Sequence, residues 1–326
     1  MGPFTRMLRS HSALAKRKRN TANLVRRVRK ALRKHSVLRS DNVTVFTAGS
    51  LGREEAGQRS DLDLFVLGRR SAASSKNRLG RLDEYEIFAS LIEANRRLGF
   101  PRFSGDGRYL KVYAIDDMKM ATGAPTDDSE NLFTARMLLL LESKPLINDR
   151  LYNRAIAQII RNYFRDHSGK KDYRPLFLLN DILRYWRTLC LNYEELRHDR
   201  GRPWFRKNIN LKFARRLTIF STVMAFLSGR VSTASDVVHL CKLTPLERLA
   251  MALDDLNDEH LFEGFSQLLN DYELFLRTKE RGLGGLSTPQ SIKRRLKTAA
   301  NRFGRFLYAA VMSHQADGRL RPYVVI

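Results

Sequence analysis

The segment GSLGREEAGQRSDLDLFVL, residues 49–67, constrains the fold most strongly, because it places two aspartates at the start of an apolar strand. Asp61 and Asp63 alternate with leucines there. Side chains two apart on a strand point to the same face, so the two carboxylates lie side by side and repel each other by about 1 kcal/mol or more. A divalent cation such as Mg²⁺, which prefers oxygen ligands, would relieve that repulsion. The alternative is a strand that simply begins after a turn, with Asp63 facing solvent.

A second feature lies just upstream of the aspartates. The β-branched run VTVFTAG, residues 43–49, predicts a strand that ends at a glycine. We expect Ser50 to cap a short helix that follows and runs through Glu55. A strand that delivers Gly49 and Ser50 to a helix start predicts a phosphate-binding loop, with exposed backbone N–H groups and a hydroxyl.

Together these residues resemble the active-site signature of the polymerase-β nucleotidyltransferase superfamily. The resemblance rests on a strand, Gly49-Ser50, a spacer of ten residues and Asp61-Leu62-Asp63 in an apolar segment. The longer pattern, GSLGRE followed by SDLD, is similar to the bacterial branch that contains the PII-protein uridylyltransferases.

The resemblance implies a metal-dependent enzyme that uses a nucleoside triphosphate (NTP) as substrate. Asp61 and Asp63 would be catalytic residues and ligands of Mg²⁺ or Mn²⁺, in the two-metal arrangement of polymerases. The residues implied to bind the nucleotide in this signature are Gly49, Ser50, Arg53 and Ser60.

The superfamily usually supplies a third carboxylate from a later strand, and the candidate here is Asp106. The predicted strand YLKVYAI, residues 109–115, carries Lys111 in its interior and has acids only on either side. We assign Asp106 as the third catalytic metal ligand because the Asp-Gly pair can place a carboxylate at the strand start. The alternative is an ordinary turn aspartate.

The charge of the chain indicates a phosphate-rich partner. It has 59 Lys and Arg against 34 Asp and Glu, a net charge of +25, which is typical of nucleic-acid binders. Residues 1–40 contain no acid and include the runs KRKR and RRVRK. We expect this segment to be a basic arm or helix that binds RNA; the alternative is a solvated helix on the outside of the domain.

A second basic segment lies near the C-terminus, at residues 291–311. Its apolar residues recur at helical spacing and predict one buried face. The basic and polar residues on or near the opposite face are Arg294, Lys297, Asn301 and Arg305.

Other sequence features bear on location and stability. No apolar run is long enough for a transmembrane helix, so no membrane partner is expected. The two cysteines, Cys190 and Cys241, lie in apolar helical contexts and predict no disulfide. A mitochondrial transit peptide is disfavoured because the basic helix runs directly into the first strand. We expect a cytoplasmic protein.

The pattern along the chain predicts an α+β fold: a small mixed-sheet nucleotidyltransferase domain followed by an α-helical domain. The expected division is a basic arm at 1–40, the catalytic domain at 41–128 and the helical domain at 129–326. The apolar segment LFTARMLLLLESKPLI is expected to be a helix that ends near Pro145. On a later helix, Arg184 and Arg187 share one side, where they would suit triphosphate binding; the alternative is pairing to Asp181 or Glu194.

Three functions from different classes fit the sequence. The first is transfer of a nucleoside monophosphate (NMP) from an NTP to an RNA, for example a tRNA end. The second is nucleotidylation of a protein, which the resemblance favours and the charge does not. The third is a catalytically silent nucleic-acid-binding module.

Overall fold

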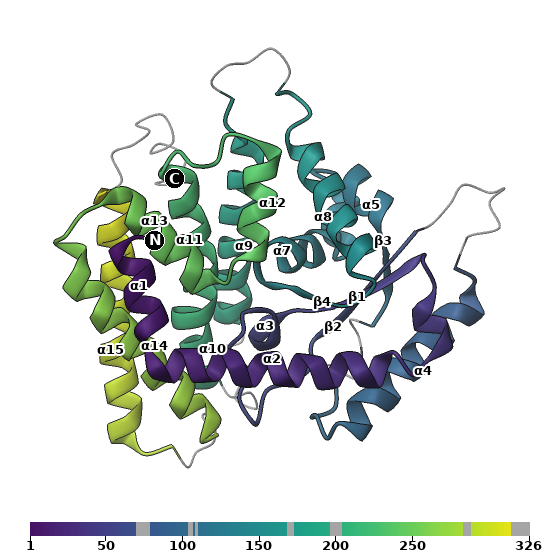
Figure 1. The fold of residues 1–326 in the computed structure, drawn as a ribbon, viewed down its shortest axis with the longest axis horizontal. Coiled ribbons are helices and arrows are strands. Elements are labelled where there is room, and N and C mark those ends of the chain that lie inside the picture. Colours follow the sequence, from purple (N-terminus) through teal and green to yellow (C-terminus); the bar gives the residue numbers. More distant parts are fainter. Residues whose placement is uncertain are drawn as a thin grey trace. The chain divides into compact units, whose positions relative to one another are not determined.

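The structure, a computed structural model, divides into two compact units. Figure 1 shows its helices and strands, coloured along the chain. The sheet unit consists of Arg17–Ser168 and Val237–Lys242. The helical unit consists of Met1–Lys16, Gly169–Asp236 and Leu243–Ile326. These boundaries differ from the expected divisions after residues 40 and 128. The residues that the structure describes are 1–69, 79–103, 107, 110–167, 173–195, 204–282 and 288–313.

A four-stranded mixed sheet forms the centre of the sheet unit, as the sequence predicts. Its strand order is β3-β2-β1-β4, with β1 antiparallel to both β2 and β4, and β2 parallel to β3. The strands are β1 (Val43–Thr47), β2 (Leu64–Gly68), β3 (Val112–Ala114) and β4 (Lys144–Ile147).

The fourth strand corrects the sequence analysis. The apolar segment expected to be one helix ending near Pro145 is instead a helix, α7 (Leu132–Glu142), followed by β4. Residues of β4 pair with β1, Thr47 opposite Lys144. Four residues give too short a pattern to separate a buried strand from the end of a buried helix.

Helices cover both faces of the sheet, which explains why nearly every strand residue is buried. On one face Val45 and Val66 pack with α2 (Ser12–Leu32) and α4 (Arg81–Arg97) in a shared apolar core. On the other face Phe46 stacks on Phe65 and packs against Tyr152 of α8 (Asp149–Tyr163). The sheet unit also contains η1 (Ser36–Arg39), α3 (Gly49–Gly52), α5 (Ile115–Met120) and α6 (Pro125–Ser129).

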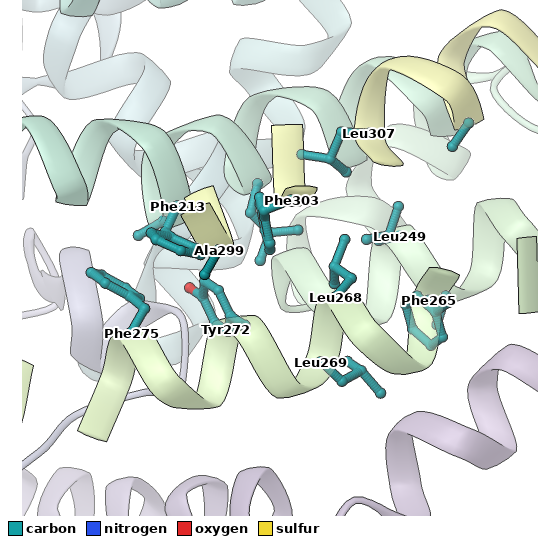
Figure 2. Packing of buried hydrophobic residues seen from close by; sticks show 14 of the residues in the cluster. Phe213, Leu249, Phe265, Leu268, Leu269, Tyr272, Phe275, Ala299, Phe303 and Leu307 are labelled. Carbon is teal, nitrogen blue, oxygen red and sulfur yellow. The ribbon is translucent and has the colours of Figure 1, made fainter. Parts of the chain in front are cut away.

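The helical unit has its own apolar core, built largely from aromatic and leucine side chains (Figure 2). Phe213 stacks on Phe275 and packs against Phe303, which comes from the last helix. The elements that contribute to this core include α1 (Pro3–Ser10), α10 (Trp204–Asn210), the π-helical turn η3 (Leu211–Arg215), α11 (Arg216–Leu227), α13 (Pro245–Leu256), α14 (Leu261–Glu280) and α15 (Gln290–Ser313). The unit also contains α9 (Leu176–Glu195), and α12 (Ala234–Lys242) passes from this unit into the sheet unit.

The basic N-terminal segment is built into the two cores and is not a separate arm. Phe4 and Leu14 are buried in the core of the helical unit. Val28, Leu32 and Leu38 are buried in the core of the sheet unit. The charged residues between them remain on the surface.

The structure also bears on membranes and cysteines. Over the described ranges, no helix combines the length and the apolar character needed to span a bilayer. Cys190 and Cys241 are both free thiols.

A buried ion pair fixes the turn between α6 and α7 in the sheet unit. The guanidinium of Arg136 donates to both carboxylate oxygens of Asp127, at 2.8 and 2.6 Å, and to the hydroxyl of Tyr163 at 2.8 Å. Both charged side chains are fully shielded from solvent. Removing one partner would leave the other charge buried and unpaired.

We therefore expect Asp127→Ala to destabilise the sheet unit by about 3 to 5 kcal/mol, the usual cost of breaking a buried pair. Asp116→Ala is the matched control, because Asp116 is an exposed acid of α5 whose pair with Lys119, at 3.4 Å, contributes at most about 1 kcal/mol. Urea denaturation of the full chain measures both. Equal midpoints for the two variants would contradict the assignment.

Candidate active site

The two halves of the sequence signature meet at one end of the sheet. Because β1 and β2 are antiparallel, the end of β1 lies beside the start of β2, with Thr47 opposite Leu64. The backbone N–H of Ala48 donates to the carbonyl oxygen of Asp63 at 3.1 Å. The loop that begins at Gly49 is therefore held directly against the aspartate pair.

Gly49 is required at this position for two reasons. Its φ of +65° lies in the left-handed region, which side chains rarely adopt. A Cβ there would also lie 2.5 Å from Oδ2 of Asp63. The bare backbone of Gly49 thus lets the carboxylate of Asp63 approach the turn.

The aspartates precede β2 and are not part of it, which corrects the expected strand. The strand begins at Leu64, yet the alternation persists: Leu62 and Leu64 are buried in the core, whereas Asp61 and Asp63 are only partly buried. Within the described ranges, the carboxylate of Asp61 has neither a hydrogen-bond nor an ion-pair partner. Both aspartates therefore lie on the accessible side of the segment.

Ser50 does not cap the short helix, contrary to the sequence prediction. The helix α3 spans Gly49–Gly52, and its N-cap is Ala48. In the part of the chain that the structure describes, the Ser50 hydroxyl makes no hydrogen bond, so it can donate to a ligand. The Ser60 hydroxyl instead accepts from the N–H of Gly57 at 3.0 Å and closes the turn before the aspartates.

Arg53 lies in a buried ion-pair network. Its Nε donates to Glu55 at 2.7 Å, and its Nη1 donates to Glu142 at the end of α7. Gly52 brings the two segments together, since a Cβ on Gly52 would overlap the carbonyl oxygen of Glu142. The structure thus gives Arg53 a structural role, and its predicted contact with nucleotide stays a prediction.

Further charges surround the same loop. Glu54 adopts a left-handed φ of 61° and pairs with Lys18 of α2 at 3.0 Å and with Lys144 of β4. Nη1 of Arg17 donates to the carbonyl oxygen of Glu55 at 3.4 Å. The loop is therefore tied to α2, α7 and β4.

The sequence analysis missed Glu142 and Lys144 as parts of this site. Both residues are nearly ninety positions away from their partners, and β4 had been assigned to a helix. The charged residues in GREE are the only local signal that could have indicated these partners. Charged side chains in a turn beside a buried strand need partners of opposite charge.

The pair Asp61 and Asp63 fits a divalent cation, since it offers two accessible carboxylates beside a bare glycine backbone. Among the described residues, no group of three His, Cys, Asp or Glu could complete a site. Asp106, the predicted third ligand, lies outside the described residues. The strand β3 runs parallel to β2, so the described residues Leu110 and Lys111, which directly precede β3, lie at the end of the sheet where β2 begins.

Arg184 and Arg187 lie on α9, which belongs to the helical unit. Nη1 of Arg184 is 3.7 Å from Oδ1 of the buried Asp181, the pairing that the sequence analysis named as the alternative. The predicted role of both arginines in nucleotide binding stays a prediction.

Comparison with known proteins agrees with this geometry. A family described as Nucleotidyltransferase domain matches residues 25–102, which include β1, α3, both aspartates and β2. Neither the curated proteins nor the solved structures gave a match to the chain. Residues 25–102 therefore carry a nucleotidyltransferase domain of the polymerase-β-like superfamily, the domain of an enzyme that transfers nucleotidyl groups.

Proposed function

We propose that this enzyme transfers an NMP from an NTP to an RNA acceptor, for example a tRNA end, with Mg²⁺ or Mn²⁺ as the metal. The observation that carries the proposal is the packing of Asp63 against Gly49, which puts a carboxylate pair beside a loop with a donor hydroxyl. Binding of a triphosphate needs both a cation and hydrogen-bond donors. At this end of the sheet, the two carboxylates can bind the cation and the Ser50 hydroxyl can donate a hydrogen bond to a phosphate.

Each residue has a role in the proposal. Asp61 and Asp63, together with Asp106, would hold the metal, which when bound neutralises the triphosphate and activates the attacking group. The Ser50 hydroxyl would donate to a phosphate, and Gly49 would let that phosphate approach the backbone. Ser60 and Arg53 would support nucleotide binding by holding the two sides of the loop, and Arg184 and Arg187 would bind the triphosphate.

The surface of α2 supports a nucleic-acid acceptor. Within the sheet unit, six exposed bases of α2 and of the turn that follows it fall within about a third of the helix circumference, opposite the buried Val28 and Leu32. Lys18 is also exposed, but it lies outside this arc and pairs with Glu54. The structure describes no carboxylate paired with any of the six bases within the arc. This basic stripe consists of Arg19, Arg26, Arg27, Lys30, Arg33 and Lys34. A group of cations without a described acidic partner suits a phosphate backbone.

We also infer a cytoplasmic location. The free thiols of Cys190 and Cys241 are compatible with a reducing compartment, where disulfides are rare. NTPs and RNA are both present there.

We expect Asp61→Asn and Asp63→Asn each to lower nucleotide transfer by roughly 100-fold or more, because even the outer partners of metal ligands contribute about 10- to 100-fold. Thermal stability should hold or rise, since each substitution removes like-charge repulsion. Incorporation of labelled NTP into total RNA and thermal melting without metal measure the two effects, with Asp116→Asn as the control. A large fall in melting temperature for Asp61→Asn or Asp63→Asn would show that the aspartates are structural.

Gly49→Ala tests whether nucleotide transfer depends on the close approach of the Asp63 carboxylate to the backbone of Gly49. Gly99 is the matched control, because it has a similar φ of +74° but open space where a Cβ would lie. Both variants carry the backbone cost of about 1 kcal/mol. Only Gly49→Ala should also lower transfer, because its Cβ displaces the Asp63 carboxylate. If both variants retained full transfer at equal stability, the contact would have no catalytic role.

The basic stripe can be tested with a charge-matched pair of variants. Arg26→Gln/Arg33→Gln removes two charges seven residues apart on the stripe. Arg154→Gln/Arg161→Gln removes two exposed charges at the same spacing on α8 of the same unit. Deleting residues 1–40 is unsuitable, because this would remove buried residues from both cores.

For the stripe variant we expect the slope of log affinity for single-stranded RNA against log salt to fall by about 1.4, since each phosphate contact contributes about 0.7. The control should keep the full slope, and NTP binding should be unchanged in both. Equal slopes in the two variants would remove the stripe as an RNA surface and favour a protein acceptor.

A further inference from the structure

The last helix, α15, has one face that the nucleotidyltransferase site does not use. One side of α15 places Ala299, Phe303 and Leu307 in the core of the helical unit (Figure 2). The opposite side carries the basic and polar positions noted in the sequence, and they are exposed. In the structure this side forms part of a cavity.

The cavity lies between α15 and α11, both in the helical unit, and has a volume of about 510 Å³. It is open to solvent, and two of its side chains are arginines. The residues that line it are Arg216, Thr298, Asn301, Gly304, Arg305 and Tyr308.

Arg216 is the central group of this cavity. Its guanidinium lies over Gly304, where any Cβ would overlap Nη1, and 5.8 Å from the centre of the Trp186 ring. The side chain is partly buried, yet it has no carboxylate, carbonyl or hydroxyl partner among the described residues. A guanidinium in this position has lost water without gaining an acceptor.

Lysine side chains near Arg216 add to the positive charge at this cavity. Burial lowers the pKa of Arg216, and the pKa of Lys212 is lowered by burial and by the nearby Arg216 and Lys297. The nearby Cys190 opposes the effect of burial on the pKa of Arg216 and raises it, whereas every cause acting on Lys212 lowers its pKa. Lys212 lies in the π-helical turn η3, and such turns occur often at functional sites.

Arg302 of α15 differs from Arg216, because it has an acidic partner. Arg302 makes two hydrogen bonds to Asp271, at 3.1 and 2.6 Å, and that contact raises its pKa. Arg302 is therefore held on the surface of the unit by an acid. Arg216 has none in the described ranges, so the missing anion would come from a ligand.

We propose that this cavity binds the phosphodiester backbone of a single-stranded polynucleotide, with Arg216 as the central phosphate contact and Arg305 at the rim. The proposal rests on the RNA acceptor proposed above. The cationic and polar face from Arg294 to Tyr308 is about 21 Å long at 1.5 Å per residue, which suits a chain of phosphates better than a single one. Tyr308 is 68% exposed and can stack on a base.

The test measures binding of a fluorescein-labelled oligouridylate by anisotropy in the Asp61→Asn chain, so that no transfer occurs. The variants added are Arg216→Met, which keeps the aliphatic length, and Arg305→Gln, an exposed substitution that cannot leave a cavity in the core. Arg295→Gln is the control, because it removes one exposed charge from the same helix outside the cavity lining.

We expect Arg216→Met to weaken oligouridylate binding about tenfold or more, the typical effect of losing a charge-assisted hydrogen bond. Arg305→Gln should weaken it several-fold, and Arg295→Gln much less. Melting temperature should not fall in Arg216→Met, since the guanidinium has no acid to lose. If both cavity variants bound like the control, the proposal would be overturned, and a lower melting temperature would show that Arg216 only packs against Trp186.

Three further outcomes separate this proposal from the proposed function, and they are measured with the same substitutions in chains that keep Asp61. UTP binding, measured by calorimetry, should be unchanged; its loss with oligouridylate binding intact would make the cavity a nucleotide site and overturn the proposal. If the unmutated chain labels RNA, and Arg216→Met binds and labels RNA as well as the unmutated chain does, only the cavity proposal fails. If RNA is never labelled but oligouridylate binding still depends on Arg216, only the proposed transfer fails.

Discussion

The guanidinium of Arg53, held between Glu55 and Glu142, is the contact on which the geometry of the candidate active site depends. It joins the loop after β1 to the end of α7, and α7 leads directly into β4, which pairs back onto β1. Both acids and the arginine are buried, so loss of one partner would leave uncompensated charge in a low-dielectric interior. The loop that carries Gly49 and Ser50 is thereby fixed relative to the aspartates.

The signature therefore combines two kinds of residue. Gly49, Asp61 and Asp63 shape the accessible edge of the sheet, where a triphosphate and its metal would bind. Gly52 and Arg53 face the interior and hold that edge in place, Gly52 by allowing the backbone of α7 to approach and Arg53 by its ion pairs. A pattern that looks uniformly catalytic in the sequence thus includes residues whose described contacts hold the fold together.

The excess positive charge is also distributed in a definite way. In the sheet unit it forms a stripe on α2, whose opposite side is buried, and in the helical unit it gathers around Arg216 and α15. In each case the apolar side of a helix is fixed in a core. Some of its bases have a described acidic partner, as Lys18 and Arg302 do, whereas the bases of the stripe and Arg216 have none among the described residues. Each unit therefore presents its own surface suited to phosphates.

The sequence by itself determined the mixed sheet, the nucleotidyltransferase signature and the alternation of Asp61 and Asp63 with buried leucines, because these follow from local periodicity and from residues close in the chain. Only the tertiary structure decided that residues 144–147 form a strand, that Ser50 does not cap α3 and that the basic segment is built into two cores. It also decided that Arg53 pairs with Glu142 while Arg216 has no described acid. The physical reason is that strand pairing, burial and ion pairing depend on partners distant in sequence, which no local pattern specifies.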